Sequence, residues 1–289
     1  MKFSVLVNTC DKFEDCWNPF FKLLGLYWRD YKGKIYLNTE YKDYSFPDLD
    51  IIPVKGCVRK KINGSFATWS QCLKWALDSI PEDIILYLQE DYFLKSQVQT
   101  SMIDDAVNLM LENKNIKCIH LTDQGCSISG SSAYEGYDQC VRHDKYRVSC
   151  QAALWYKDEL YTLLREWESA WEFEQFGSKR SAVLNHTYLA VSSKIVKKDN
   201  FEILPYVFTG IIKGRWYEET IPLFDKHDIF MDWSIRGLFS EAKPETFYQK
   251  TKRRMGRVPR YIIAYLDLFK LSVTKYTELS QVNIHSSSD

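Results

Sequence analysis

The chain has 289 residues, which suits one large domain or two small ones and allows a substantial buried core. Its 38 basic and 38 acidic residues balance, so the protein has no overall charge that would attract nucleic acid. Aromatic residues make up 15% of the chain. Most of them would fill a core, and the excess weakly favours sugar or nucleobase ligands, because flat rings pack well against both.

The eight cysteines form no CxxC pair and no histidine cluster accompanies them, so their spacing argues against a zinc site. Met1 leads directly into a strand-like segment without the features of a secretory signal peptide. No apolar run approaches the ~20 residues of a membrane span. We therefore expect a cytoplasmic protein with reduced thiols.

The first part of the chain alternates strand-like and helix-like segments. Strands are expected at residues 3–7, 34–37, 51–54 and 84–88. Helices are expected up to about Tyr27, with Asp15 as the cap, and from about Phe66 to Leu77, because apolar residues recur there at helical spacing. This β-α-β-β-α-β order predicts the α/β class, with a mostly parallel central sheet flanked by helices.

The second part continues the pattern and then changes character. The expected segments are a helix at 97–113, a strand at 116–121, a long surface loop at 123–140, a strand at 149–155 and a helix at 157–168. Residues 1–240 contain no evident linker and predict one domain. Residues 241–289 combine a basic run with an apolar-rich stretch and predict a basic amphipathic helical tail.

The apolar run at 84–88 ends in Gln89, Glu90 and Asp91. Ligands of open α/β sheets bind just outside the carboxyl ends of strands. Carboxylates there suit a hard divalent cation, Mn²⁺ or Mg²⁺, and with it a phosphate-bearing substrate. Asp11 follows the first strand, and two parallel neighbouring strands would bring both acidic ends to one edge. An ordinary solvated acidic strand end is the alternative.

These strand ends resemble a known family. An N-terminal strand followed by Thr9 and Asp11, with acidic residues after a later strand, is similar to the nucleotide-sugar-binding half of GT-A-fold glycosyltransferases. The family's usual acidic signature is Asp-x-Asp, and this chain departs from it with Gln89, Glu90 and Asp91. The chain has no GxGxxG and no Walker loop, which disfavours a dinucleotide or P-loop enzyme.

The resemblance extends into the second half of the domain. Three segments are similar to bacterial transferases that build capsular polysaccharide or lipopolysaccharide: residues 148–154 (VSCQAAL), 171–178 (WEFEQFGS) and 211–216 (IIKGRW). The resemblance implies a GT-A-like single domain over 1–240. Its nucleotide-sugar-binding half would be 1–122 and its acceptor-binding half 123–240.

The resemblance also implies roles for residues of the donor site. Thr9 and Asp11 correspond to nucleobase contacts, since a carboxylate can accept the N3–H of uracil; a turn or helix-cap role for Asp11 is the alternative. The loop that would approach the nucleotide holds Asn63, Gly64 and Ser65, which a simple turn explains equally well.

For a metal, the resemblance points first to Asp91 and then to Glu90. His227 is a further expected ligand, as a late histidine is in some relatives. A lone histidine with a structural role is the alternative. The altered acidic signature leaves open whether the protein requires a metal.

Two glutamates between aromatic residues are the candidates for catalysis. A base must deprotonate the acceptor hydroxyl as it attacks the sugar, and partial burial would raise the pKa of a carboxylate toward that task. By the family pattern Glu174 is the base, and Glu172 binds acceptor hydroxyls. An exposed charged helix surface is the alternative for both.

Four cations are candidates to stabilise the diphosphate leaving group: Lys179, Arg180, Lys213 and Arg215. Solvated surface cations are the alternative. The tail carries a second basic group, which with the apolar residues after it suits an anionic membrane surface. That group comprises Lys252, Arg253, Arg254, Arg257 and Arg260. Packing of the tail on the domain's own surface is the alternative.

The sequence therefore predicts a glycosyltransferase that uses a nucleotide sugar, most simply a UDP-sugar, and a glycan or lipid-linked acceptor in bacterial surface polysaccharide synthesis. A presumed base implies inversion at the sugar. The expected location is cytoplasmic and peripheral on the inner face of the membrane, without nucleic-acid binding. The alternative is a non-catalytic glycan-binding protein on a degenerate transferase fold. Sugar-nucleotide synthesis is disfavoured, because the glycine-rich basic N-terminal loop of such enzymes is missing.

Overall fold

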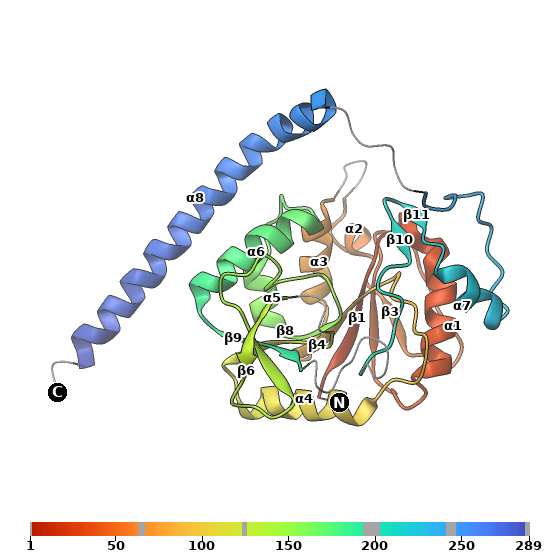
Figure 1. Ribbon diagram of the computed structural model, residues 1–289, viewed down its shortest axis with the longest axis horizontal. Helices are drawn as coiled ribbons and strands as arrows, with labels where there is room; N and C mark the ends of the chain where they lie inside the picture. Colours follow the sequence, from red (N-terminus) through yellow and green to blue (C-terminus); the bar gives the residue numbers. More distant parts are fainter. Residues whose placement is uncertain (1, 63–66, 123–125, 193–202, 241–246, 287–289) are drawn as a thin grey trace.

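A computed structural model describes residues 2–62, 67–122, 126–192, 203–240 and 247–286, the last segment by its backbone alone at 247–254 and 278–286. One nine-stranded sheet runs through the domain in the order β3-β2-β1-β4-β8-β5-β9-β7-β6 (Figure 1). The strands are β1 (Ser4–Asn8), β2 (Ile35–Asn38), β3 (Ile51–Pro53), β4 (Ile84–Gln89), β5 (Ile116–His120), β6 (Ile128–Ser131), β7 (Tyr137–Cys140), β8 (Ala153–Tyr156) and β9 (Thr187–Val191).

The sheet is mostly parallel, as the sequence predicts. Strands β1 to β4 pair in parallel with one another, and β9 is parallel to β5. Strand β8 is antiparallel to both of its neighbours, and β7 is antiparallel to β9 and β6. These pairings leave β7 and β8 as the two strands that run against the other seven.

Helices cover both faces of the sheet. The helical segments are the 3₁₀ helix η1 (Asp11–Cys16), α1 (Trp17–Tyr27), α2 (Gly56–Arg59), α3 (Trp69–Leu77), α4 (Thr100–Glu112), α5 (Lys157–Leu163), α6 (Ala170–Leu184), α7 (Thr220–Lys226) and α8 (Phe247–Ser286). Side chains of α1, α4 and α7 pack on one face, and side chains of α3, α5 and α6 pack on the other. Strand β4 is therefore buried on both sides, which explains its continuous apolar sequence.

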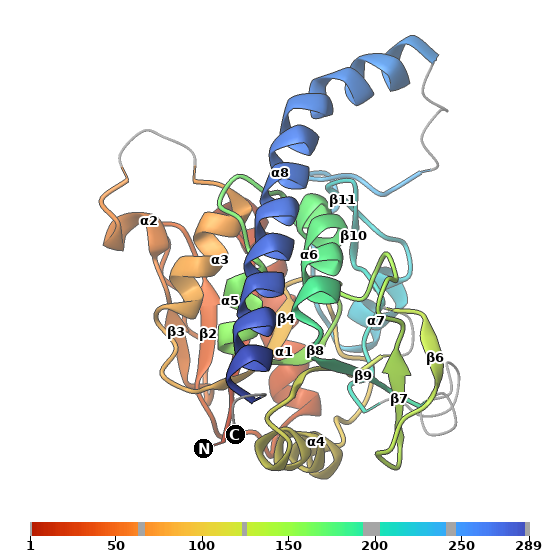
Figure 2. The same ribbon diagram turned by 90° about the vertical axis from the view of Figure 1, so that its left-hand side faces the viewer.

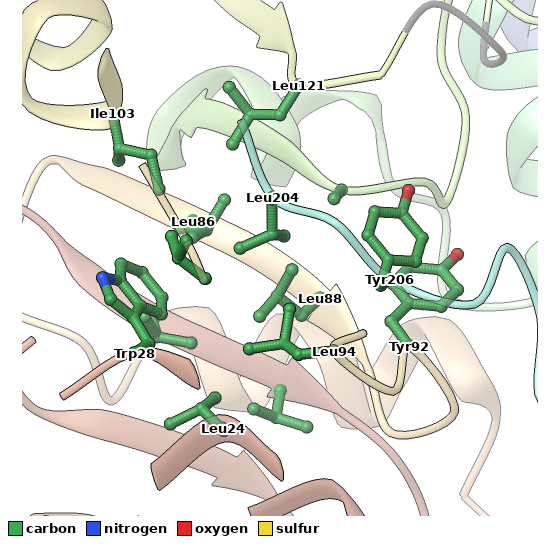
Figure 3. Close-up of a cluster of buried hydrophobic side chains, with 14 of the residues drawn as sticks. Leu24, Trp28, Leu86, Leu88, Tyr92, Leu94, Ile103, Leu121, Leu204 and Tyr206 are labelled. Carbon is green, nitrogen blue, oxygen red and sulfur yellow. The ribbon is translucent and has the colours of Figure 1, made fainter. Parts of the chain in front are cut away.

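The core on the α1 face reaches the end of β4. Figure 3 shows Leu86 and Leu88 of β4 between Leu24 of α1 and Leu204 of a later segment. At the strand's end the rings of Tyr92 and Tyr206 stack with their centroids 4.7 Å apart. This packing brings the segment after residue 203 against the chain that leaves β4.

Two expected elements of the second half differ from the sequence prediction. The loop expected at 123–140 contains the hairpin β6–β7; β6 is exposed along its length, so no apolar alternation marks it. The strand expected at 149–155 begins only at Ala153. Its first residues leave the ladder because the Cys150 amide donates to Glu174 and the Cys150 carbonyl accepts from Tyr92.

Helix α8 lies along α6 (Figure 2). Phe176 of α6 packs against Tyr261, Ala264 and Leu268 of α8, and Arg165 forms an ion pair with Asp267 at 2.8 Å. The apolar residues Ile262 and Phe269 are exposed. Among the described residues, no helix combines the length and apolarity that a bilayer crossing requires.

Candidate active site

The carboxyl ends of β1, β2 and β4 meet at one edge of the sheet. Asn8 is in register with Asn38 of β2 on one side and with Gln89 of β4 on the other. The residues that follow these strands are therefore neighbours. The expectation that Asp11 and the acidic end of β4 share one edge is confirmed.

Asp91 anchors a distant part of the chain. A turn closed by the Tyr92 amide on the Gln89 carbonyl carries Asp91 off β4. Its Oδ2 accepts hydrogen bonds from the Thr209 hydroxyl at 2.9 Å, the Gly210 amide at 3.1 Å and the Ile211 amide at 3.0 Å. Burial raises the pKa of Asp91, and these three bonds partly oppose that rise. Its Oδ1 accepts no hydrogen bond from another described residue.

The anchored segment leads into a hairpin of β10 (Ile211–Ile212) and β11 (Arg215–Trp216). Its turn residues Lys213 and Gly214 both have positive φ, 51° and 78°, as a two-residue type I′ turn requires. Trp216 is buried against Phe93, which fixes the base of the hairpin. Lys213 and Arg215 are exposed at its tip.

Glu90 is buried beside Asp91. The residue is only 9% exposed, and no other described residue donates a hydrogen bond to its carboxylate. Burial, and then the neighbouring Asp91 charge, raise the pKa of Glu90 well above its usual range. A positive charge next to a carboxylate in this position would stabilise its ionised form.

One cation near Glu90 comes from a residue that the sequence did not single out. Arg236 forms a bidentate ion pair with Asp15, at 2.6 Å from Nε and 2.5 Å from Nη2, and stacks on the ring of Phe13. Its charge opposes the rise in the pKa of Glu90. Asp15, expected as a helix cap, takes this role instead, and α1 begins without a side-chain cap. No local pattern links two residues 221 positions apart.

Asp11 organises the edge between β1 and β2. Its Oδ1 accepts from the Glu40 amide at 2.9 Å, and its Oδ2 accepts from the amides of Tyr41 and Lys42 at 2.9 and 3.2 Å. Thr9 is buried, and its hydroxyl accepts from the Trp17 indole at 2.9 Å. Both residues thus lie at the predicted place, and Asp11 also fulfils the turn role that was the alternative.

Glu174 reaches the same edge through Cys150. Its Oε1 accepts from the Cys150 amide at 2.9 Å, and the Cys150 carbonyl accepts from the Tyr92 hydroxyl at 2.7 Å, next to Asp91 in the chain. Burial raises the pKa of Glu174, and the Cys150 bond and the Lys145 charge partly oppose that rise. Its Oε2 accepts no hydrogen bond from another described residue.

Glu172 lies two residues earlier and is used differently. It is the third residue of a capping box, with its Oε2 accepting from the Ser169 amide and hydroxyl at 2.9 and 2.8 Å. Arg260 of α8 contacts the same oxygen at 3.4 Å. This carboxylate stabilises the start of α6 and its contact with α8.

Lys179 and Arg180 do not join the cations of the hairpin. Arg180 is fully buried and forms an ion pair with both oxygens of Glu168, while its Nε donates to the Leu163 carbonyl at 2.8 Å. Lys179 donates to the Tyr265 hydroxyl of α8 at 2.7 Å. Their expected role at a diphosphate is corrected, because both serve the packing of α6.

His227 does not meet Asp91. Its Nε2 lies 2.6 Å from the Tyr27 hydroxyl at the end of α1, and its carbonyl accepts from Lys22. Helix α1 starts beside Glu90 and runs away from it for 11 residues, about 16 Å at ~1.5 Å per residue. The expected metal-ligand role of His227 is therefore corrected to a structural one. Asn63, Gly64 and Ser65 lie outside the described residues.

No model of a protein family matches the chain, and no curated protein matches it. Among solved structures the chain is similar to S. aureus TarS 1–349, with a TM-score of 0.42 and 13% identity over 70% of this chain and 59% of that one. It is also similar to the mannosyltransferase PcManGT from Pyrobaculum calidifontis, with a TM-score of 0.40 and 11% identity over 68% and 58%.

A third similar structure is the glucosyl-3-phosphoglycerate synthase from Mycobacterium tuberculosis, with a TM-score of 0.38 and 8% identity over 62% of this chain and 64% of that one. The chain spans 59% of the TarS 1–349 chain and 37% of a second TarS structure. The structure itself establishes the α/β class, with the acidic pair at the carboxyl edge of a mostly parallel sheet.

Proposed function

We propose that the protein is a glycosyltransferase that moves a sugar from a nucleotide-sugar donor to a glycan or lipid-linked glycan. The observation that carries this proposal is the pair of buried carboxylates at the end of β4. Glu90 and the Oδ1 of Asp91 accept no hydrogen bond from another described residue, and the hairpin held by Asp91 presents two exposed cations. Such an edge suits a ligand that carries phosphate.

The donor set fits a hard divalent cation such as Mn²⁺ or Mg²⁺. Asp91 Oδ1 and the Glu90 carboxylate would hold the cation, since carboxylate oxygens without other partners are its preferred ligands. When bound, the cation would neutralise the donor diphosphate. Asp91 Oδ2 keeps its three hydrogen bonds and so fixes the direction of Oδ1.

The remaining donor contacts follow from the same edge. Lys213 and Arg215 would contact the diphosphate from the hairpin, where positive charge stabilises the departing nucleotide. The nucleobase would lie near Thr9 and Asp11. Among the described residues Asp11 Oδ1 accepts one hydrogen bond, which leaves a lone pair for the N3–H of uracil.

Glu174 is the proposed general base. The Cys150 amide holds one of its oxygens, and the other is available to take the proton of an acceptor hydroxyl. As that proton leaves, the acceptor oxygen would form a bond to the anomeric carbon while the bond to the nucleotide breaks. Displacement in one step inverts the configuration at the anomeric carbon of the transferred sugar.

UDP binding tests the proposed metal site separately from the stability of the fold. Isothermal titration of UDP with and without Mn²⁺ would compare the wild type with Asp91→Asn, whose amide oxygen still accepts from Thr209 and Gly210. We expect the variant to lose at least tenfold in Mn²⁺-dependent affinity at an unchanged melting temperature. Equal affinity of both proteins would remove Asp91 from the proposal.

Glu174 and Glu172 provide a test variant and a matched control for the proposed general base. Glu174→Gln should lower kcat by about 10²–10⁴-fold, the usual contribution of a general base, with donor KM little changed. Glu172→Gln keeps an acceptor for the capping box and should retain kcat within a few-fold. UDP-sugar binding without turnover, across a panel of donors and acceptors, would instead support a non-catalytic glycan-binding protein.

We further propose that α8 places the enzyme on an anionic membrane surface, beside a lipid-linked acceptor of bacterial surface polysaccharide synthesis. Support comes from the two sides of the helix. Ala264 and Leu268 are buried on α6, whereas Ile262 and Phe269 are 56% and 68% exposed. The exposed Arg257 lies just before them in the same helix, and basic residues beside an apolar stripe favour anionic lipid.

A further inference from the structure

Three side chains that commonly bind metals meet at the β5–β9–β7 part of the sheet. His120 ends β5, Cys140 ends β7 and Cys126 lies just before β6. A ring nitrogen of His120 and the two sulfurs all lie within 4.8 Å of one another. His120 and Cys140 are buried and Cys126 is half-buried.

The two thiols are close but not bonded. Their Sγ atoms are 2.9 Å apart, whereas a disulfide requires about 2.05 Å. A third thiol lies on the same face, with the Sγ of Cys118 3.7 Å from Nε2 of His120. Two sulfurs and one imidazole are thus gathered within 4.8 Å of one another, and the Cys118 thiol lies beside the imidazole.

The imidazole of His120 has a buried lone pair with no partner. Its Nε2 lies 3.0 Å from the carbonyl of Arg147, which can only accept, so Nε2 carries the ring hydrogen. Nδ1 then keeps its lone pair, is buried and has no hydrogen-bond partner among the described residues. A buried acceptor left in this way is costly unless something positive contacts it.

Arg147, next to this cluster, carries a buried positive charge without a nearby negative partner among the described residues. Its residue is 2% exposed, and its guanidinium donates to the carbonyls of Cys140 and His186 at 2.9 and 2.7 Å. Within the described part of the chain its Nε has no hydrogen-bond partner and it forms no ion pair; its guanidinium stacks on the Tyr188 ring, 4.4 Å from the ring centroid. A buried cation without a countercharge is strongly destabilising.

We propose that His120, Cys126 and Cys140 bind a zinc ion, with Cys118 as the fourth ligand once its thiol turns from the Nε2 side of the imidazole toward the ion. Three cysteines and one histidine are a common set for a closed, tetrahedral structural zinc site. Binding converts three thiols to thiolates and releases three protons. The complex of Zn²⁺ with three thiolates and a neutral imidazole carries one net negative charge, which balances Arg147.

The zinc ion also gives the buried Nδ1 of His120 a partner. Nδ1 donates its lone pair to the ion, and the Arg147 carbonyl holds Nε2–H, an arrangement that orients metal-bound imidazoles in general. A Zn–S bond of about 2.3 Å places two thiolates about 3.8 Å apart. Cys126 and Cys140 therefore separate by about 1 Å on binding, which the half-buried position of Cys126 permits.

The ion would cross-link the edge of the sheet. His120 belongs to an interior strand, whereas Cys126 and Cys140 hold the two ends of the β6–β7 hairpin, in which Ile128 pairs with Cys140. Strand β6 is the exposed edge strand. Zinc at this position stabilises the hairpin and takes no part in the chemistry proposed at Asp91.

Zinc binding to the full chain tests the site directly. The reduced protein, stripped of metal with a chelator, is titrated with Zn²⁺ against a chromophoric competitor. We expect one equivalent per chain, at least 100-fold weaker binding by Cys126→Ser and by Cys140→Ser, and unchanged binding by Cys57→Ser, a matched buried thiol elsewhere in the fold. Co²⁺ in place of Zn²⁺ should show thiolate-to-metal charge-transfer absorption.

Thermal unfolding controls for misfolding. Without metal, Cys126→Ser should melt close to the metal-free wild type, and Zn²⁺ should raise the melting temperature of the wild type alone by several degrees. Less than one equivalent on the reduced wild type, or wild-type affinity in Cys126→Ser, would overturn the proposal. A Cys126–Cys140 disulfide in protein isolated under reducing conditions would overturn it as well. These readouts do not depend on transferase activity.

Discussion

The side chain of Asp91 and the backbone of Gly210 are joined across 119 positions of the sequence. The Gly210 amide lies 3.1 Å from Oδ2 of Asp91 and 3.0 Å from its carbonyl oxygen. One residue therefore fixes the hairpin that carries Lys213 and Arg215 while leaving its own Oδ1 available. The proposed metal ligand and the proposed phosphate contacts are held in a single arrangement.

Gly210→Ala should destabilise the protein by about 1–3 kcal/mol, the usual range for an overpacked core. A Cβ at this position would lie 2.2 Å from Cε2 of Phe93 and 2.9 Å from the Asp91 carbonyl. Urea unfolding measures the loss. Gly256→Ala in α8 is the control, because its Cβ meets nothing within 4 Å and alanine favours a helix. A Gly210→Ala protein as stable as the wild type would show that the hairpin shifts freely.

Glu90→Gln should remove a pH dependence of stability. The pKa of Glu90 is raised in the folded protein, so the folded state binds the proton more tightly than the unfolded state does. The unfolding free energy of the wild type should therefore fall as pH rises above 4.5, by up to about 1.4 kcal/mol per pH unit, until the folded pKa is passed.

Urea unfolding at several values between roughly pH 5 and 8, without divalent cations, measures the difference in stability between the two proteins. Glu90→Gln should be more stable than the wild type at the upper end, and the gap should close toward acid pH. Glu112→Gln, on the exposed surface of α4, is the matched control. Parallel curves for the wild type and Glu90→Gln would contradict the buried position of this carboxyl.

Arg180→Met should cost about 3–5 kcal/mol of stability, because it leaves the Glu168 carboxylate buried without its partner. The double variant with Glu168→Leu should recover most of that loss, since a well-packed apolar pair replaces an ion pair at little cost. Urea unfolding of the four proteins in the cycle gives the coupling. UDP affinity should stay the same in the double variant; a selective loss of affinity would restore Arg180 to the donor site.

The exposed side of α8 should bind anionic vesicles. Ile262→Ser combined with Phe269→Ser should lower co-sedimentation with phosphatidylglycerol vesicles at least tenfold, because each side chain contributes about 1.5–3 kcal/mol when buried. Leu111→Ser, which changes an exposed apolar residue of α4, should have no effect. Equal binding to neutral vesicles would contradict the role of the basic residues. A dimer that the double variant abolishes would assign the same face to a second copy.

The general arrangement of the domain was predictable from local sequence. The apolar run at 84–88 predicts a buried strand, and the acidic residues after it, with Asp11 after the first strand, predict a site at one edge. The register of β1 with β4 confirms that placement. Strand and helix patterns depend on neighbouring residues, so a single sequence contains them. The β6–β7 hairpin was missed because an exposed strand carries no apolar alternation.

The sequence alone determined which side chains follow the ends of β1 and β4, because the extent of a strand and the residues after it can be read from local pattern. Only the tertiary structure decided what each of them contacts. Glu172 and Glu174 look alike in sequence, yet one caps α6 and the other meets Cys150. Asp91 meets Gly210, Asp15 meets Arg236, and Cys126 meets Cys140. These contacts depend on how distant segments pack. Burial at these contacts shifts the pKa of each side chain and decides which of its polar atoms lack a hydrogen-bond partner, and the chemistry of the site depends on both.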